Sequence, residues 1–342
     1  MTNIQVPLPG EGPGPLGGEV DAVEGISVQA VTQWDLFWSR LRRHRLAMIS
    51  AAVLGLIIVV AFIAPLFTCD FGDANQYCGK PLEHFAEQLE NPETGRLWVN
   101  IAPRGDFPFG TDELARDVMS RVIHGGRASL LVGALTGLLV AVLGTVVGAI
   151  AGYYPGPIDQ SLMRFTDLAL GLPLLPVAIV VGRLLPELTF LPSWMKSGPW
   201  GIAFLLGFLL WGTLARIVRA EFLSLREKEF VEAARAAGAG DRRIIFRHIL
   251  PNAISPIIVQ TTLIVGTAII IEAALSFLGF GVRPPIPTWG GMAASGANVA
   301  TRGLWWELVF ASSALIITVL AVNFIGDGLR DALDPTQTIE RR

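Results

Sequence analysis

The residues best suited to a specific interaction lie in one polar segment between Glu221 and Pro251. Most residues as far as Ala237 favour helix formation. Gly238 then fits the end of that helix, because a residue without a Cβ atom readily adopts the left-handed conformation. Asp241 can cap a second helix, and Pro251 suits the boundary where the next apolar segment begins. The pattern predicts two short helices joined by a glycine turn.

The side chains of this segment indicate docking of another protein rather than catalysis. Phe222, Leu225 and Phe230 offer apolar surface within an otherwise charged stretch. Four alanines would let a partner approach closely: Ala233, Ala234, Ala236 and Ala237. No H-E-x-x-H, G-x-S-x-G or C-x-x-C pattern occurs anywhere in the sequence. We therefore expect no catalytic residues in this chain.

The composition shows what kind of scaffold must position this segment. The chain is 52% hydrophobic and 16% charged, whereas soluble domains carry about 25% charged residues. The net charge of −3 gives no reason to expect a nucleic-acid partner. Six segments are long and apolar enough to cross about 30 Å of hydrocarbon: Leu46–Phe67, Ala128–Ile158, Phe165–Leu185, Ser197–Ala215, Ile249–Val282 and Leu308–Gly326. The sequence predicts an all-α integral membrane protein in a lipid bilayer.

The distribution of lysine and arginine predicts the orientation of these spans. Sixteen of these residues fall on the side of both termini, against four in the two short loops on the other side. Short cytoplasmic loops carry the excess of basic residues in membrane proteins. Both termini and the loop 216–251 are therefore expected in the cytoplasm, and the loop 68–127 outside it.

The segments outside the spans differ in composition. Residues 1–33 alternate proline with glycine and are expected to form a disordered cytoplasmic tail. Residues 34–45 place aromatic residues beside arginines at helical spacing. They form either an amphipathic helix on the membrane surface or ordinary juxtamembrane sequence. The remaining boundaries are the first span at 46–67, a small external lobe at 68–104, a core of five spans at 128–335 and a tail at 336–342.

Two cysteines, Cys69 and Cys78, fall in the first external loop. Thiols that can meet outside the cytoplasm are usually oxidised, so we expect a disulfide there; the alternative is two unpaired cysteines. The four histidines are scattered along the chain, and no metal site is expected: His44, His84, His124 and His248.

The polar segment resembles the EAA motif of ABC importer permeases. The matching residues are Glu232-Ala233-Ala234, then Gly238, then Leu250-Pro251. The general motif has isoleucine where His248 stands, and the stretch 247–252 is instead typical of the dipeptide/oligopeptide/nickel branch. The resemblance implies that this loop couples to an ATPase through seven residues: Glu232, Ala233, Ala234, Gly238, His248, Leu250 and Pro251.

Other segments resemble the same branch, over roughly residues 34–335 without the lobe. They are 109–118, 152–154, 275–281 with 284–285 and 289–290, and 326–331. In the usual pattern a glycine precedes Arg116-Asp117, whereas this chain has Ala115, which we interpret as a minor change.

Two features lie inside the apolar spans. Glu272 interrupts the fifth span, and charge at membrane depth usually faces a cavity or a partner. In the functional interpretation, Glu272 lines the translocation pathway or lies at a permease–permease contact. In the structural interpretation, it makes a hydrogen bond within the helix bundle or lies nearer the external interface. Glycines in the second span permit close helix packing: Gly133, Gly137, Gly144, Gly148 and Gly152.

The resemblance implies a non-catalytic permease subunit with a six-helix, type I importer-like fold in a bacterial or archaeal inner membrane. Its sequence has no G-x-x-x-x-G-K-[ST] loop, so ATP and Mg would be bound by two partner ATPase subunits. A second homologous permease and an external solute-binding protein complete the implied importer, with peptides as the expected solute. The alternatives are import of a nickel complex or an oligosaccharide, and, from a different class, a secondary transporter that needs no ATPase.

Overall fold

The computed structural model describes residues 33–67, 95, 97–105, 107–189, 192–196 and 198–333. Within these residues the regular structure is helical apart from isolated bridge residues such as Thr111 and Asp117, which confirms the all-α expectation. The expected Cys69–Cys78 disulfide, the tail at 1–32 and the tail at 336–342 lie outside the described residues, as does most of the lobe at 68–104.

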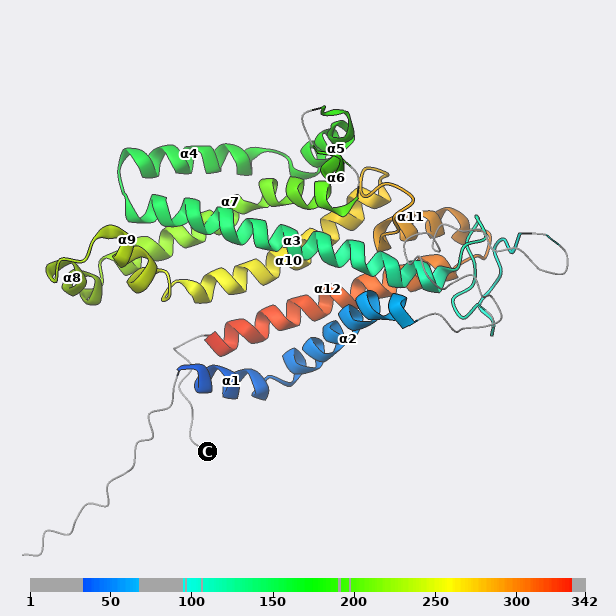
Figure 1. The fold of residues 1–342 in the computed structure, drawn as a ribbon, viewed down its shortest axis with the longest axis horizontal. Helices are drawn as coiled ribbons and strands as arrows, with labels where there is room; N and C mark the ends of the chain where they lie inside the picture. The colour runs from blue at the N-terminus through cyan, green and yellow to red at the C-terminus, as the bar shows by residue number, and fades with distance from the viewer. Residues whose placement is uncertain are drawn as a thin grey trace, which may run out of the picture.

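The described helices form one elongated bundle (Figure 1). Their bounds are α1 Gln33–Arg43, α2 Arg45–Phe67, α3 Val118–Tyr153, α4 Pro157–Gly171, α5 Leu174–Leu184, the 3₁₀ turn η2 Leu185–Glu187, α6 Ser193–Lys196, α7 Pro199–Arg226, α8 Glu229–Ala236, α9 Asp241–Arg243, the π-helical turn η3 Ile244–Ile249, α10 Ile254–Phe277, α11 Trp289–Ala300 and α12 Trp306–Leu333. Helices α8 and α9 lie at one end of the bundle and α11 lies at the other. We call these the α8 end and the α11 end.

Five described helices are long and apolar enough to cross a membrane: α2, α3, α7, α10 and α12. The predicted third span, Phe165–Leu185, is not one continuous helix: it falls across α4 and α5–η2, a pair bent by 85° that forms either a broken span or a re-entrant loop. Leu172 is extended, at φ −71° and ψ 131°, as expected for a residue before proline. Pro173 has no N–H with which to continue the helix. The part of the chain that the structure describes therefore has five candidate spans, or six if the bent pair counts as one.

Helix α3 is longer than the predicted second span. It begins at Val118 rather than near Ala128 and has 36 residues. Arg121 and Arg127 therefore belong to a helix rather than to the end of a loop. At about 1.5 Å per residue the helix is about 54 Å long, so α3 extends well beyond the hydrocarbon layer.

Glycines bring α3 close to its neighbours, as the sequence predicted. Three of them face α7: Gly144, Gly148 and Gly152. A Cβ atom built on Gly148 would lie only 2.5 Å from the carbonyl oxygen of Ala215. On the other side of α3, a Cβ atom on Gly133 would lie 2.6 Å from the side chain of Ile269 in α10. The packing of α3 between α7 and α10 thus depends on the absence of these side chains.

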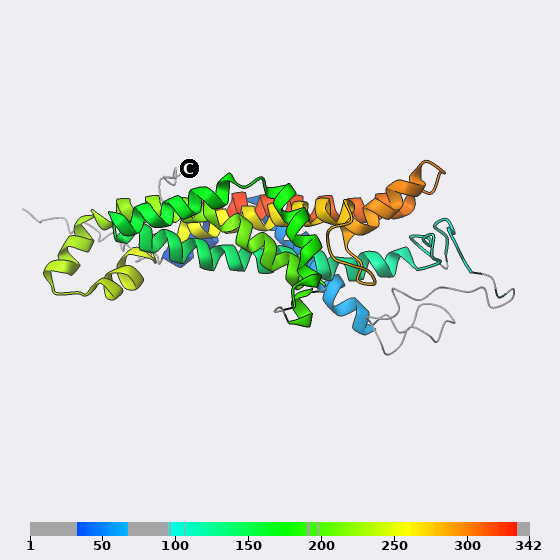
Figure 2. The same cartoon turned by 90° about the horizontal axis from the view of Figure 1, so that it is seen from above.

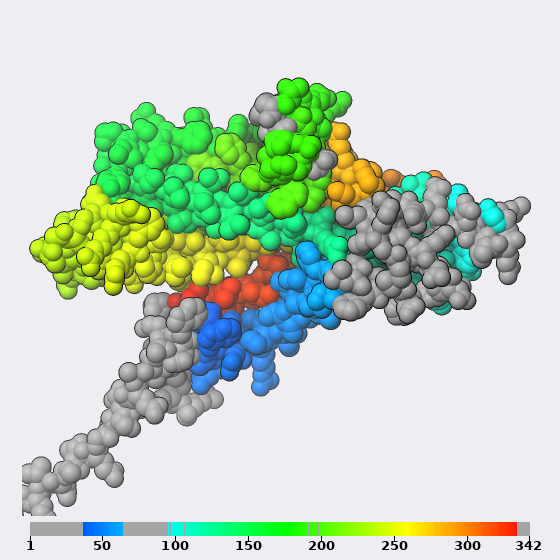
Figure 3. All heavy atoms as spheres, in the orientation of Figure 1, coloured from blue at the N-terminus to red at the C-terminus, as the bar shows by residue number. Residues whose placement is uncertain are grey.

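Helices α1 and α2 lie along α12 (Figure 3). Gly328 of α12 allows the close approach of Ala47 of α2, and the Nε2 atom of His44 lies 3.5 Å from a carboxylate oxygen of Asp331. Helix α1 therefore packs beside α12, and its location on a membrane surface stays a prediction. Seen from above, α11 extends past the ends of the neighbouring helices (Figure 2).

Candidate functional site

The polar segment between α7 and α10 folds at the α8 end; we call residues Glu229–Ile249 the α8–η3 segment (Figure 1). Helix α7 ends at Arg226, and a turn at 227–228 separates it from α8. The single helix expected up to Ala237 is therefore divided into two. Gly238 follows α8 with φ +80°, the left-handed conformation that its sequence position predicted.

One face of the α8–η3 segment is buried against the ends of α3 and α7. Val231 of α8 and Ile244 and Ile249 of η3 are fully buried. They belong to the same apolar core as Phe222 of α7 and Tyr153 of α3. Burial of apolar side chains is the main favourable term in packing outside lipid, so the segment is fixed to both helices.

The opposite face is exposed and carries large apolar side chains. Phe230 is 40% exposed and Phe246 is 62% exposed. An open hollow of about 680 Å³ lies beside Phe246 and is lined by residues 240–243. The structure places all seven predicted coupling residues on or just after this segment. Glu232, Ala233, Gly238 and Pro251 are exposed, and Ala234, His248 and Leu250 are half-buried.

Asp241 does not cap the second helix, contrary to the sequence-based expectation. The residue at the N-cap of α9 is Gly240, which makes no side-chain hydrogen bond. The carboxylate of Asp241 instead accepts hydrogen bonds from the hydroxyl groups of Tyr153 (2.7 Å) and Tyr154 (3.1 Å). The two tyrosines were noted in the sequence as part of a motif, but their partner lies far away along the chain.

Glu272 is fully buried between α3 and α10. Its carboxylate accepts hydrogen bonds from the hydroxyl groups of Ser129 (3.0 Å) and Ser276 (2.7 Å). The Ser129 hydroxyl in turn accepts a hydrogen bond of 3.4 Å from the backbone N–H of Trp289, the first residue of α11, so these hydrogen bonds connect α3, α10 and α11. This geometry matches the structural alternative for Glu272, and its role in a pathway stays a prediction.

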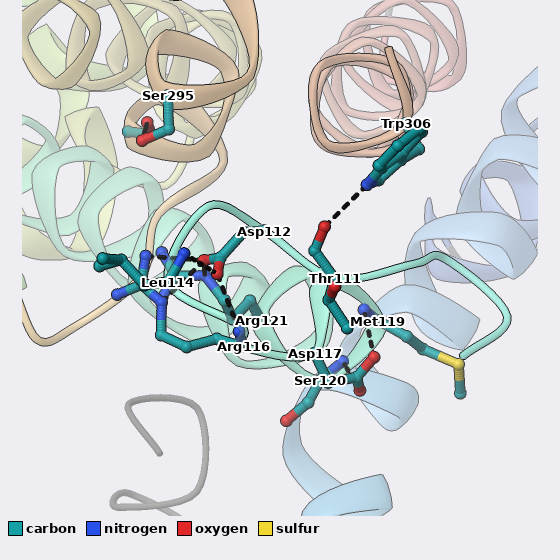
Figure 4. Close-up of polar contacts among 11 residues, drawn as sticks. Thr111, Asp112, Leu114, Arg116, Asp117, Met119, Ser120, Arg121, Ser295 and Trp306 are labelled. Atoms are coloured by element: carbon teal, nitrogen blue, oxygen red, sulfur yellow. Dashed lines mark hydrogen bonds and ion pairs between the residues drawn. The ribbon is translucent and has the colours of Figure 1, made fainter. Parts of the chain in front are cut away.

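A buried group of charges supports the start of α3 at the α11 end (Figure 4). The carboxylate of Asp112 pairs with Arg116 at 2.7 Å and with Arg121 at 3.5 Å. The carbonyl oxygen of Thr111 accepts a hydrogen bond of 2.9 Å from the indole N–H of Trp306. Sequence reasoning identified this motif but missed Arg121 and Trp306, because neither belongs to the matched stretch 109–118.

Asp117 caps α3 through hydrogen bonds from the backbone N–H groups of Met119 (3.3 Å) and Ser120 (2.9 Å). Burial raises the pKa of Asp117, against the lowering effect of these two bonds. Ala115, two residues earlier, is fully buried and has φ +58°. The replacement of the usual glycine is therefore not minor, because alanine is strained in this region by about 1–2 kcal/mol.

Comparisons with known proteins agree with this architecture. Residues 144–339 match the family described as "Binding-protein-dependent transport system inner membrane component". Residues 32–77 match the "N-terminal TM domain of oligopeptide transport permease C". The dipeptide transport system permease protein DppC of Alkalihalophilus pseudofirmus is 38% identical over 90% of this chain and 91% of its own length. The oligopeptide transport system permease protein OppC of Bacillus subtilis is 34% identical over 94% of this chain and 95% of its own length.

The fold is also similar to a solved structure. A chain of the MetNI methionine ABC transporter in an inward-facing conformation aligns with a TM-score of 0.52 at 18% identity. The alignment covers 64% of this chain and 98% of that chain.

The chain belongs to the binding-protein-dependent transport system inner membrane component family, the permeases of ABC transporters. It is a multi-pass inner-membrane protein and a non-catalytic subunit. Within this family it is of the OppC/DppC type. Membership implies that it works with a binding protein and an ATPase.

Proposed function

We propose that this chain pairs with a second homologous permease to form the membrane pathway of a peptide importer. The names of its relatives support peptides as the solute: dipeptide for DppC and oligopeptide for OppC. Under this proposal a solute-binding protein delivers the peptide, and two ATPase subunits bind ATP and Mg.

The observation that carries the proposal is the exposed face of the α8–η3 segment. A docking site should be exposed on one side and firmly attached on the other, so that movement of the partner reaches the membrane helices. Phe230 and Ala233 lie on the exposed side, while Val231 and Ile244 fix the segment to α7 and α3. We therefore assign this face as the surface that meets the ATPase.

This assignment also gives the orientation of the bundle. The α8 end would face the cytoplasm with both termini, in agreement with the excess of lysine and arginine on that side. The α11 end would face outward and meet the binding protein. A reporter fused after Arg342 should then behave as cytoplasmic, and an extracytoplasmic signal would contradict the orientation.

The docking assignment is tested with Ala233→Arg and a matched change at the opposite end, Asn298→Arg. Both residues are exposed on a helix. Ala233→Arg adds a long charged side chain to the proposed contact and should prevent copurification of the ATPase. Asn298→Arg should leave the amount of copurified ATPase unchanged. If Ala233→Arg retains the ATPase at the wild-type ratio, the docking surface is elsewhere.

A further inference from the structure

The contact between Tyr153, Tyr154 and Asp241 joins two parts of the fold that are otherwise held by apolar packing. Tyr153 is the last residue of α3, and Asp241 is the first residue of α9 in the α8–η3 segment. The two hydroxyl groups donate to the two different oxygens of one carboxylate. Hydrogen bonds to an ionised acceptor are about twice as strong as neutral ones.

The surroundings of the two tyrosines hold this contact in place. The Tyr153 ring is buried in the apolar core, and its backbone carbonyl accepts a hydrogen bond of 3.1 Å from Arg226 at the end of α7. The Tyr154 ring meets the Tyr153 ring edge to face, with centroids 4.9 Å apart. The Tyr153 hydroxyl therefore has little freedom to turn away from Asp241, whereas Tyr154 is 38% exposed and is placed mainly by its contact with the Tyr153 ring.

The other end of α3 is equally well fixed. Asp117 caps the first turn, and Arg121 pairs with Asp112 beneath it. Between these ends the helix is continuous. A displacement applied at Asp241 can thus reach the α11 end through one unbroken helix.

We propose that Tyr153 and Tyr154 are positioning residues that fasten the α8–η3 segment to α3, so that the segment and α3 move as one body. The inference rests on the proposed function, because the ATPase would supply the displacement. Without the two hydroxyl groups the ATPase would still dock on the exposed face, but the segment would slide against the end of α3.

The test measures one distance in the assembled complex with its ATPase, between spin labels at Leu114→Cys and Arg247→Cys. Both positions are exposed, one just before α3 and one in η3. The native Cys69 and Cys78 are first replaced by serine. In the otherwise wild-type chain the distance should be the same without nucleotide and with ATP and vanadate. In the Tyr153→Phe/Tyr154→Phe chain it should shift by about 2 Å, a common size of helix displacement in switching proteins.

Thr136→Val is the matched control, because it removes a hydroxyl hydrogen bond from α3 to Ala203 of α7 (3.2 Å) and leaves the α8–η3 segment alone. It should behave as the wild type. Asp241→Asn, a second variant that keeps the shape of the side chain, should shift in the same direction as the double variant. A distance that changes with nucleotide in the wild-type chain, or that stays fixed in the double variant, would overturn the inference. Absence of the ATPase from the wild-type complex would instead overturn the proposed function, and this inference with it.

Discussion

The close contact between α3 and α7 gives a quantitative prediction for Gly148→Ala. The new Cβ atom would lie 2.5 Å from the carbonyl oxygen of Ala215 and 2.7 Å from the Cβ atom of Val218. Neither atom can move by a change of rotamer, so the two helices must separate locally by about 1 Å. Forcing extra methyl groups into a packed interface costs about 1–3 kcal/mol.

Part of this cost is offset because alanine favours a helix over glycine by about 0.8–1.0 kcal/mol. Gly55→Ala in α2 isolates the second effect, since a Cβ atom there would meet no atom within 4 Å. The overpacking cost is therefore the difference between the two variants, about 1–3 kcal/mol. For a protein of about 150–250 residues, 1 kcal/mol corresponds to roughly 2–4 °C in Tm, and the shift falls as the chain becomes longer.

The assay is thermal denaturation of the purified complex in detergent, followed by the loss of the monodisperse peak in size-exclusion chromatography. Gly148→Ala should lose this peak at a temperature a few degrees lower than Gly55→Ala does. Equal or higher stability of Gly148→Ala would show that α3 and α7 are farther apart than the structure has them. Gly148 would then have no role in the packing of α3 against α7.

Two further substitutions test the α8–η3 segment and the buried carboxylate. Gly238→Asp should uncouple ATP hydrolysis from uptake, because it places a charged residue at φ +80° on the proposed docking face. Gly240→Asp is the matched control, since the backbone there has φ −73°, and it should retain more uptake per ATP hydrolysed. Glu272→Leu should lower stability by about 1–3 kcal/mol, since it removes the acceptor of Ser129 and Ser276 in a buried site. Glu272→Gln keeps an acceptor, and unchanged uptake and assembly in that variant would count against a pathway role.

Local sequence signals were enough for most of the helices. Long apolar stretches located five spans, and the left-handed residue after α8 followed from Gly238 alone. The bend of the third span had a visible signal too, since Leu172 precedes Pro173 in the middle of the stretch. The whole stretch was still predicted as one span because it is apolar throughout its centre. Its apolar composition carries no information on where the chain bends.

The partners of the polar residues were harder to find. Glu272 was identified as an unusual charge, but one of its donors, Ser129, is 143 residues away. Asp241 was given the local role of a helix cap, whereas its hydrogen bonds come from the end of α3, 87 and 88 residues earlier. A capping preference is a local property, and a contact over such a separation depends on how the helices pack.

Helix α3 connects these long-range contacts. Its first half carries Arg121 and Ser129, its last turns carry the glycines that face α7, and its last residue is Tyr153. A helix that only crossed the bilayer would need about 20 residues, whereas α3 has 36. The additional turns place one end in the charged group at the α11 end and the other against the α8–η3 segment. The length of α3 is therefore explained by the contacts at both of its ends, and any rigid displacement of one end must appear at the other.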